Sequence, residues 1–337
     1  MKKVKIGIVG LGRLGRKHAE NIAFRVPNAE LTAVCSIVKS EVDEVQRAWD
    51  IKYGYYSFDE MLGNKELDAI FISSSSGEHC RQIEAALDAG FHVFSEKPLG
   101  ITVEECLSAA RAVERHGDKV FMLGFMRRYD SSYAYAKRKI EEGLIGKPYL
   151  IRCYGLDPVN AIQGAIRFAE TSGGIFLDMA IHDFDLARWY LESEAKSVYA
   201  IGGCYAYKEF EKYGDADNAA ALVQFENGAM GLFYAGRTCA HGYHIETEVV
   251  GTKGSLRIGT VPYKNLVTVF NETGAVNECV GGFLERFDRA YLNELREFVN
   301  CIVEGRKPDV TVYDGVKSTE LAYAAKESFE GNKLVFL

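Results

Sequence analysis

Long apolar runs are absent from this 337-residue sequence, and so are blocks of like charge, internal repeats and low-complexity segments. No stretch approaches the roughly 20 consecutive apolar residues that a bilayer-spanning helix needs. The apolar run after Lys2 and Lys3 is short and broken by glycine, unlike the core of a secretory signal peptide. We therefore expect a cytoplasmic protein without a membrane partner.

Net charge is also small, with a formal value of -7 and 26% charged residues. A mildly acidic protein has no electrostatic attraction for nucleic acids or anionic surfaces. Without like-charge blocks there is no reason to expect a disordered interaction tail. We expect no nucleic-acid partner.

Closely spaced cysteines are missing as well. The eight cysteines are scattered, and no two of them form a C-x-x-C pair. Such wide spacing fits neither a zinc knuckle nor a secreted disulfide framework, so buried free thiols are the simplest interpretation. It also argues against a zinc-dependent alcohol dehydrogenase, which uses cysteine and histidine ligands, and we predict no metal site.

What is present is enough apolar material, 47% of the residues, for two domains. The first 125 residues alternate helical patterns with short apolar runs. A helix is predicted over 78–90, and another begins at Thr102 with Glu105 in a capping box. Apolar runs of this kind are typical of strands buried on both faces of a doubly wound parallel sheet. The predicted strands are Val4–Gly10, Glu30–Ile37, Asp68–Ser74, His92–Ser95 and Lys119–Phe125.

After Gly124 the pattern changes, which places the domain boundary between residues 124 and 125. A helix is expected over 128–142, followed by strands joined by hairpins, and the hairpin signal is clearest at Asn227-Gly228, where both turn residues would need positive φ. The second domain, 125–337, is therefore predicted to be α+β with an open antiparallel sheet. Its further hairpins and its closing helices are expected at 251–254, 271–274, 283–303 and 313–329.

A glycine-rich loop follows the first strand, in the sequence Gly10-Leu11-Gly12-Arg13-Leu14-Gly15. The context of strand, loop and helix supports a dinucleotide-binding fingerprint over an incidental turn. The first glycine permits the tight turn, the second lets the backbone approach a pyrophosphate, and the third lets helix and strand pack closely. Donors at the helix start, from Arg13 and Leu14 onward, would bind the phosphates.

The end of the second strand should decide between NAD and NADP. Proteins that bind NAD often carry an acidic residue there, but the corresponding position is Ser36. Serine does not repel a 2′-phosphate, and Lys39 lies close enough in sequence to meet one; a solvated loop residue is the alternative interpretation of Lys39. NAD, NADP and both remain compatible with the sequence.

Two further segments should face the cofactor, because ligands of such sheets bind at the carboxyl ends of strands. The first is the serine-rich loop 73–79, in which Ser74, Ser75 and His79 are candidate contacts; simple N-capping by one serine is the alternative. The second is Glu96-Lys97-Pro98, which directly follows the strand that begins at His92.

Asp178 and His182 lie four residues apart on a predicted helix, so their side chains share one face. Taken alone, such a pair would be an inconsequential surface contact, and Lys97 alone would be a surface lysine. The glycine fingerprint, Glu96-Lys97-Pro98, the segment GFMRRYDSSY at 124–133 and this helix occur in one order along the whole chain. Together they resemble the glucose–fructose oxidoreductase/inositol dehydrogenase family, and the GFMRRYDSSY segment is most similar to the inositol dehydrogenases.

The resemblance implies a Rossmann domain, a catalytic triad of Lys97, Asp178 and His182, and oxidation of an inositol by NAD(P). Ordinary histidine titrates near pH 6.5, which suits His182 as the general base. Asp178 would orient the imidazole, and Lys97 would stabilise alkoxide character on the substrate oxygen. The hydride goes to the nicotinamide, so no metal is required.

The resemblance also implies substrate contacts from Arg127, Asp157 and Tyr243, with structural or solvated polar roles as the alternative for each. It implies a homo-oligomer, dimer or tetramer, that associates through the open sheet face. The segment after Pro158 departs from the family pattern, which leaves the inositol isomer open. Oxidation of glucose, another sugar or an aminocyclitol is the alternative activity, and a non-catalytic NAD(P)-binding regulator is the alternative class.

Overall fold

The computed structural model describes residues 3–259 and 263–337. Contacts divide the chain into two compact units. The first unit comprises Met1–Tyr129 and Arg289–Thr319, and the second comprises Asp130–Asp288 and Glu320–Leu337. Within the described residues no helix is both long and apolar enough to cross a membrane. All eight cysteines are free and six of them are buried, as the spacing predicted.

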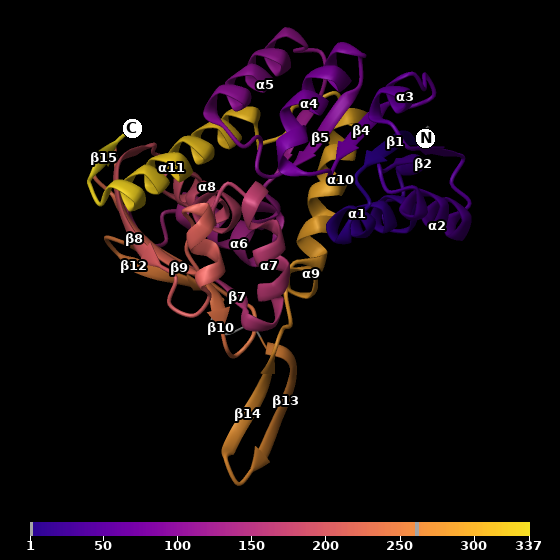
Figure 1. The fold of residues 1–337 in the computed structure, drawn as a ribbon. Helices are drawn as coiled ribbons and strands as arrows, with labels where there is room; N and C mark the ends of the chain where they lie inside the picture. Colours follow the sequence, from indigo (N-terminus) through magenta and orange to yellow (C-terminus); the bar gives the residue numbers. More distant parts are fainter. Residues whose placement is uncertain (1–2, 260–262) are drawn as a thin grey trace. The chain divides into compact units, whose positions relative to one another are not determined.

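The first unit is built on a six-stranded parallel sheet with the order β3-β2-β1-β4-β5-β6 (Figure 1). The strands are β1 (Val4–Val9), β2 (Ala29–Cys35), β3 (Tyr53–Tyr55), β4 (Ala69–Ile72), β5 (His92–Glu96) and β6 (Phe121–Gly124). The doubly wound parallel sheet predicted from the apolar runs is therefore confirmed. Only β3 was not predicted, because three half-buried residues carry no hydrophobic period.

Helices connect these strands. They are α1 (Arg13–Phe24), α2 (Lys39–Trp49), α3 (Phe58–Leu62), α4 (His79–Asp88) and α5 (Val103–Arg115). The predicted cap of α5 is present, since the Thr102 side chain accepts a hydrogen bond from the Glu105 backbone N–H at 3.2 Å. The loops of this unit contain the 3₁₀ turns η1 (Ser76–Glu78) and η2 (Met126–Tyr129).

Helix α10 (Asp288–Glu304) belongs almost entirely to the first unit, which differs from the expected division at residues 124/125. Its apolar face shares one buried core with β1, β2 and β5. The α10 residues of this core are Leu292, Leu295, Phe298, Val299 and Cys301. The chain thus returns to its first unit after building most of the second, and no local change in composition signals that return.

The second unit is built on a seven-stranded sheet with the order β12-β11-β7-β10-β9-β8-β15. The strands are β7 (Pro148–Pro158), β8 (Ala195–Gly203), β9 (Asn218–Phe225), β10 (Met230–Cys239), β11 (His244–Gly251), β12 (Gly254–Ile258) and β15 (Val335–Phe336). The predicted open antiparallel sheet is confirmed, except that β7 and β10 pair in parallel. That pair joins two separate antiparallel ladders into one sheet.

The helices of this unit include α8 (Ile181–Leu191), which contacts β7, and α7 (Ile162–Phe168), which contacts β10. Helix α6 (Ser131–Glu141) begins three residues later than expected, because Asp130 caps it by accepting from the Ser132 and Tyr133 backbone N–H groups. The remaining helical segments are η3 (Val159–Ala161), η4 (Ala169–Thr171), η5 (Phe176–Ala180), η6 (Lys208–Tyr213), α9 (Phe283–Arg286) and α11 (Val312–Gly331), which spans both units.

The hairpins occur where they were predicted, but the Asn227-Gly228 turn has another geometry. Only Gly228 has positive φ, at +86°, and the Phe225 N–H bonds to the Ala229 carbonyl. The loop therefore contains three residues, with glycine alone in the left-handed conformation, rather than two with positive φ.

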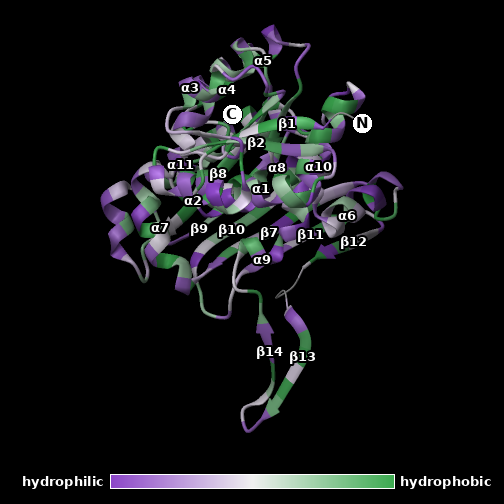
Figure 2. Cartoon of the chain, turned by 90° about the vertical axis from the view of Figure 1, so that its right-hand side faces the viewer, coloured by the Kyte–Doolittle hydropathy of each residue, from purple (hydrophilic) through white to green (hydrophobic). Residues whose placement is uncertain are grey.

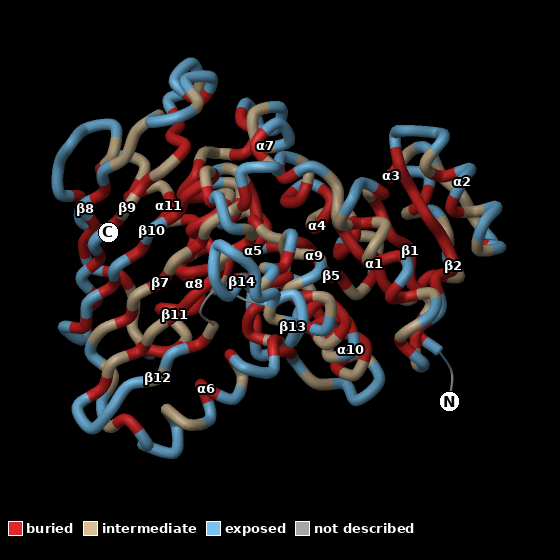
Figure 3. Tube along the Cα trace, turned by 90° about the horizontal axis from the view of Figure 1, so that it is seen from below, coloured by how far each residue is buried: buried red, intermediate tan, exposed pale blue. Residues whose placement is uncertain are grey.

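The hairpin formed by β13 (Tyr263–Asn271) and β14 (Gly274–Cys279) makes a separate two-stranded sheet. Figure 2 shows apolar residues along it, and Figure 3 shows that most of both strands is exposed.

Candidate active site

The glycine loop brings the backbone of three segments close together and leaves one open surface. Gly10 has φ +90°, and a Cβ there would lie 2.2 Å from the Ser73 carbonyl oxygen; a Cβ on Gly15 would lie 2.0 Å from the Gly10 carbonyl oxygen. Both positions therefore need glycine for close packing. Gly12 is different, because a Cβ there would meet nothing within 4 Å. Its open surface lies at the start of α1, where the N-cap residue is Gly12 itself and makes no side-chain cap hydrogen bond.

Ser36, directly after β2, is buried, and its hydroxyl takes part in two hydrogen bonds. Its hydroxyl donates to Glu41 Oε2 at 2.7 Å and accepts from the Val38 backbone N–H at 3.1 Å. A carboxylate, that of Glu41 from the first turn of α2, thus lies beside position 36, which sequence spacing did not reveal. Lys39 is exposed, and its ammonium lies 5.1 Å from the centre of the Tyr56 ring.

The serine-rich loop is fixed from within the first unit. Ser74 donates to Gln82 Oε1 at 2.7 Å, while Ser75 is exposed. The His79 ring lies between two backbone carbonyls, with Nδ1 2.7 Å from Pro98 O and Nε2 3.3 Å from Ser74 O. Burial lowers the pKa of His79, so the neutral ring has one N–H to donate, and the shorter distance favours Pro98. His79 thereby ties this loop to the Glu96-Lys97-Pro98 segment.

Glu96 ends β5 and turns inward, whereas Lys97 is partly exposed. One Glu96 oxygen lies 2.7 Å from His18 Nε2, and the other accepts from the Lys97 backbone N–H at 3.2 Å. Both carboxylate oxygens are therefore used inside the unit, and a direct cofactor contact from Glu96 stays a prediction.

Asp178 and His182 lie in the second unit at a change of helix type. Asp178 is inside the π-helical turn η5, which runs directly into α8, where His182 is buried. A π turn widens the helix by one residue and occurs frequently at functional sites. A regular helix was predicted here, so the wider turn was missed.

Asp178 lies beside a buried Arg237–Asp215 ion pair that the sequence did not reveal. The Arg237 guanidinium, on β10, lies 3.6 Å from Asp178 Oδ2 and 2.7 Å from Asp215 Oδ2. Asp215 Oδ1 in turn accepts from the Ile175 backbone N–H at 2.8 Å, at the start of the helical segment. Arg237 is 2% exposed, so this buried arginine balances the buried carboxylate of Asp215 and the partly exposed carboxylate of Asp178, and Asp215 fixes the start of the turn that carries Asp178.

The three predicted substrate contacts differ in their surroundings. Arg127 is buried in η2 of the first unit. Asp157 is partly exposed near the end of β7, and Tyr243, just before β11, is buried with its ring edge-on to Phe287 at 6.3 Å. The latter two belong to the second unit, and the substrate contacts of all three stay predictions.

Two family models match this chain. Residues 4–125 match the oxidoreductase family with an NAD-binding Rossmann fold, and residues 133–257 match the GFO/IDH/MocA C-terminal domain. Among curated proteins, scyllo-inositol 2-dehydrogenase (NAD(+)) of Bacillus subtilis strain 168 is 37% identical over 337 residues, which is 99% of this chain and 96% of that protein.

Solved structures are similar over the same extent. The scyllo-inositol dehydrogenase of Lactobacillus casei, with bound NAD(H) and scyllo-inositol, is 46% identical with a TM-score of 0.96, covering 99% of each chain. The myo-inositol 2-dehydrogenase of Lactobacillus plantarum is 36% identical with a TM-score of 0.97, covering 100% of each chain. The open glycine cradle and the full-length similarity together show that this chain is an oxidoreductase of the GFO/IDH/MocA family, as its motifs predicted.

Proposed function

We propose that this chain is an NAD-dependent inositol dehydrogenase that oxidises a secondary alcohol of scyllo-inositol, or of myo-inositol, to the inosose. The observation that carries the proposal is the 46% identity over 99% of the chain to an enzyme whose structure holds NAD(H) and scyllo-inositol. The lower identity of 36% to the myo-inositol 2-dehydrogenase favours the scyllo isomer.

The residues take the roles that the family resemblance implies. His182 accepts the hydroxyl proton, Asp178 orients the imidazole and stabilises its charged form, and the Lys97 ammonium donates to the same substrate oxygen. Arg127, Asp157 and Tyr243 bind further hydroxyls. NAD, when bound over the Gly12 surface, supplies the hydride acceptor.

The contacts of Ser36 support NAD over NADP. The Glu41 carboxylate lies 2.7 Å from the Ser36 hydroxyl, at the strand end where the ribose 2′ position is expected. A carboxylate there accepts a hydrogen bond from a 2′-hydroxyl and repels a 2′-phosphate. Lys39 would offset that repulsion only in part, because it is exposed and solvated.

A homo-oligomer, dimer or tetramer, is part of the proposal, and the cytoplasmic location stays a prediction. Large apolar side chains lie at alternate positions of β8, β9 and β10, and the register places them on one face of the sheet. A second copy of the chain would cover this face. The exposed residues concerned are Tyr199, Ile201, Leu222, Met230, Leu232 and Tyr234.

Initial rates on scyllo-inositol, myo-inositol and glucose, each with NAD and with NADP, test the activity. We expect the highest kcat/KM for scyllo-inositol with NAD. Faster oxidation of glucose would make the chain a sugar dehydrogenase. NAD(H) binding without turnover of any polyol would make it a regulator.

His182→Ala tests the assignment of the base. Loss of the proton acceptor should lower kcat by about 10²–10⁴-fold, while NAD(H) affinity is retained. His116→Ala is the control, since His116 lies on the surface beside Asp88 at 2.7 Å. Near-normal turnover by the His182 variant would remove it from the mechanism.

A further inference from the structure

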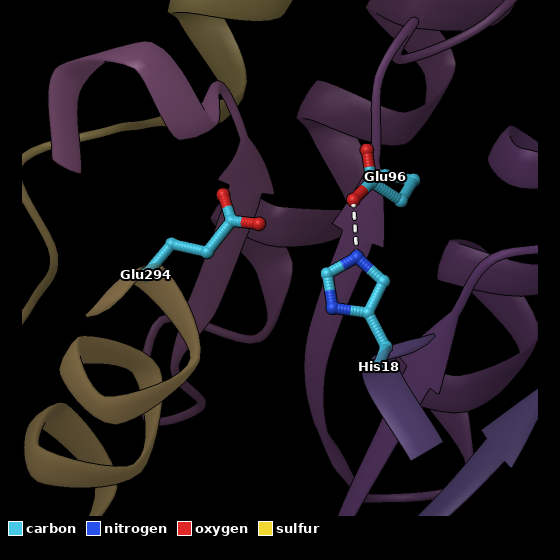
Figure 4. A group of neighbouring side chains, drawn as sticks. All are labelled: His18, Glu96 and Glu294. Atoms are coloured by element: carbon cyan, nitrogen blue, oxygen red, sulfur yellow. Dashed lines mark hydrogen bonds and ion pairs between the residues drawn. The ribbon is translucent and has the colours of Figure 1, made fainter. Parts of the chain in front are cut away.

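Behind Lys97, in the first unit, lies a buried cluster of three titratable side chains that the proposed chemistry does not use. His18 of α1, Glu96 of β5 and Glu294 of α10 point toward one another (Figure 4). Their donor atoms all lie within 4.8 Å of one another, and none of the three is more than 5% exposed. Three elements far apart in the sequence are thus brought to one polar point inside an apolar core.

Within the described part of the chain, two groups of the cluster lack hydrogen-bond partners, and one can donate the hydrogen bond that the other can accept. Both oxygens of Glu294 and the Nδ1 atom of His18 are buried and have no hydrogen-bond partner among the described residues. His18 Nε2 is already engaged with Glu96 at 2.7 Å, and as an N–H it donates to that carboxylate. Nδ1 is then left as an acceptor that needs a donor, and a protonated Glu294 is one.

Charge also requires a proton on Glu294. Burial, and then the nearby Glu96 carboxylate, raise the pKa of Glu294 well above its ordinary value. The other groups facing it are His18 and the phenol of Tyr129, whose pKa burial and Glu294 both raise. No cation among these groups offsets a second buried carboxylate, so a neutral acid is the stable form.

A divalent cation could in principle balance the two carboxylates, but the surroundings disfavour one. Rings of Phe71 and Tyr291 pack against His18 at 4.5 and 5.4 Å, and they offer a metal no carbonyl or carboxylate oxygen. The direct His18–Glu96 bond, and the use of the other Glu96 oxygen by Lys97, leave only Glu294 and His18 Nδ1 unoccupied within the cluster. A proton on Glu294 removes the second negative charge and needs no further ligands, whereas a metal ion would need about three or four.

We propose that Glu294 is a positioning residue that acts on Lys97 through a buried relay of hydrogen bonds. In this relay Glu294 moves within hydrogen-bonding distance of His18 Nδ1, to which it makes no hydrogen bond in this structure, and donates to it. His18 Nε2–H donates to Glu96, and Glu96 accepts from the Lys97 backbone N–H. The relay fixes the tautomer of His18. Its end point is the backbone of the lysine to which the proposed function assigns alkoxide stabilisation, so the catalytic part of this inference rests on that function.

Thermal unfolding of the wild type and of Glu294→Gln tests the proton on Glu294. In the unfolded chain glutamate ionises near pH 4.3, whereas in the folded protein Glu294 retains its proton, so wild-type stability falls as pH rises above that value. Glutamine is neutral in both states. We expect Tm of the variant, relative to wild type, to rise progressively between about pH 5 and pH 8. A Tm difference that does not change over this range would overturn the proposal, and so would a stoichiometric divalent metal in elemental analysis of the purified protein.

The relay itself is tested by the Lys97 amide resonance in ¹⁵N-lysine-labelled protein. Glu294→Leu removes the donor, and the resonance should shift; Glu294→Gln supplies an amide donor and should restore it. Glu297→Gln is the control, because Glu297 lies on the same helix but pairs with Arg306 at the surface. An unmoved Lys97 resonance in the leucine variant would refute the relay, whether or not any polyol is turned over.

Kinetics separate positioning from stability alone. In Glu294→Leu we expect kcat to fall by about 10- to 100-fold and its acid limb to move to higher pH, with NAD(H) affinity unchanged. Glu294→Gln should recover both the rate and the pH profile. An equal, pH-independent loss in both variants would mean a structural role only.

Discussion

At the scale of single residues, Arg237 determines the charge balance around Asp178. Its guanidinium donates to Asp215 Oδ2 and to the Ala216 carbonyl, and lies 4.5 Å from the centre of the Phe210 ring. A planar cation with several donors can meet two carboxylates and an aromatic face together, which lysine cannot.

Arg237→Met is expected to destabilise the folded protein by about 3–5 kcal/mol, because Asp215 would be left as a buried charge without its cation. Denaturant unfolding measures this loss. Adding Asp215→Asn to the same protein should recover part of the stability, since the unpaired charge is then removed. A loss below about 1 kcal/mol for Arg237→Met, the size of a surface pair, would contradict this account.

Some residues of the candidate site could be predicted from the sequence, and others could not. Gly10, Gly12 and Gly15 could be assigned from sequence because the three glycines lie together between a predicted strand and a predicted helix. Glu41 and Arg237 could not, because each reaches its functional neighbour through a side chain placed by another element.

At the scale of elements, the loop between β1 and α1 combines two kinds of glycine. Gly15 has no room for a Cβ, whereas Gly12 has φ -63° and nothing within 4 Å. One glycine is therefore required by the fold, and the other leaves an open surface on which we propose that the cofactor lies.

Substitution by alanine separates the two requirements. Gly15→Ala should lower stability by about 1–3 kcal/mol, because the methyl group overlaps the Gly10 carbonyl. Gly12→Ala should leave Tm unchanged but weaken NAD(H) binding by at least about 10-fold, since the methyl group occupies the pyrophosphate surface. Thermal unfolding and fluorescence titration measure both. A Gly12 variant that binds NAD(H) normally would mean that the cofactor does not approach this loop.

At the scale of the whole molecule, the exposed sheet face of the second unit is the main surface left to explain. Leu222 and Leu232 are cross-strand neighbours and are 54% and 37% exposed. A contiguous exposed patch of apolar side chains usually marks a site of protein–protein interaction, because soluble monomers rarely leave such a patch in contact with water.

Light scattering after size exclusion tests that interface. Leu222→Glu combined with Leu232→Glu should raise the dissociation constant of the oligomer by more than about 100-fold, because two unpaired charges would be buried. Leu107→Glu, on exposed α5 of the first unit, should leave the assembly unchanged. An intact oligomer in the double variant would place the interface elsewhere.

The sequence by itself determined the parallel sheet, the phosphate loop, the hairpin positions and the helix that holds Asp178 and His182. These features follow from short-range sterics and from the periods of strand and helix, which can be read along the chain. Tertiary structure alone decided that α10 returns to the first core, that Glu41 lies beside Ser36, and that Glu294 faces His18 and Glu96. Such contacts depend on which buried faces meet when distant segments pack, and no local pattern encodes that choice.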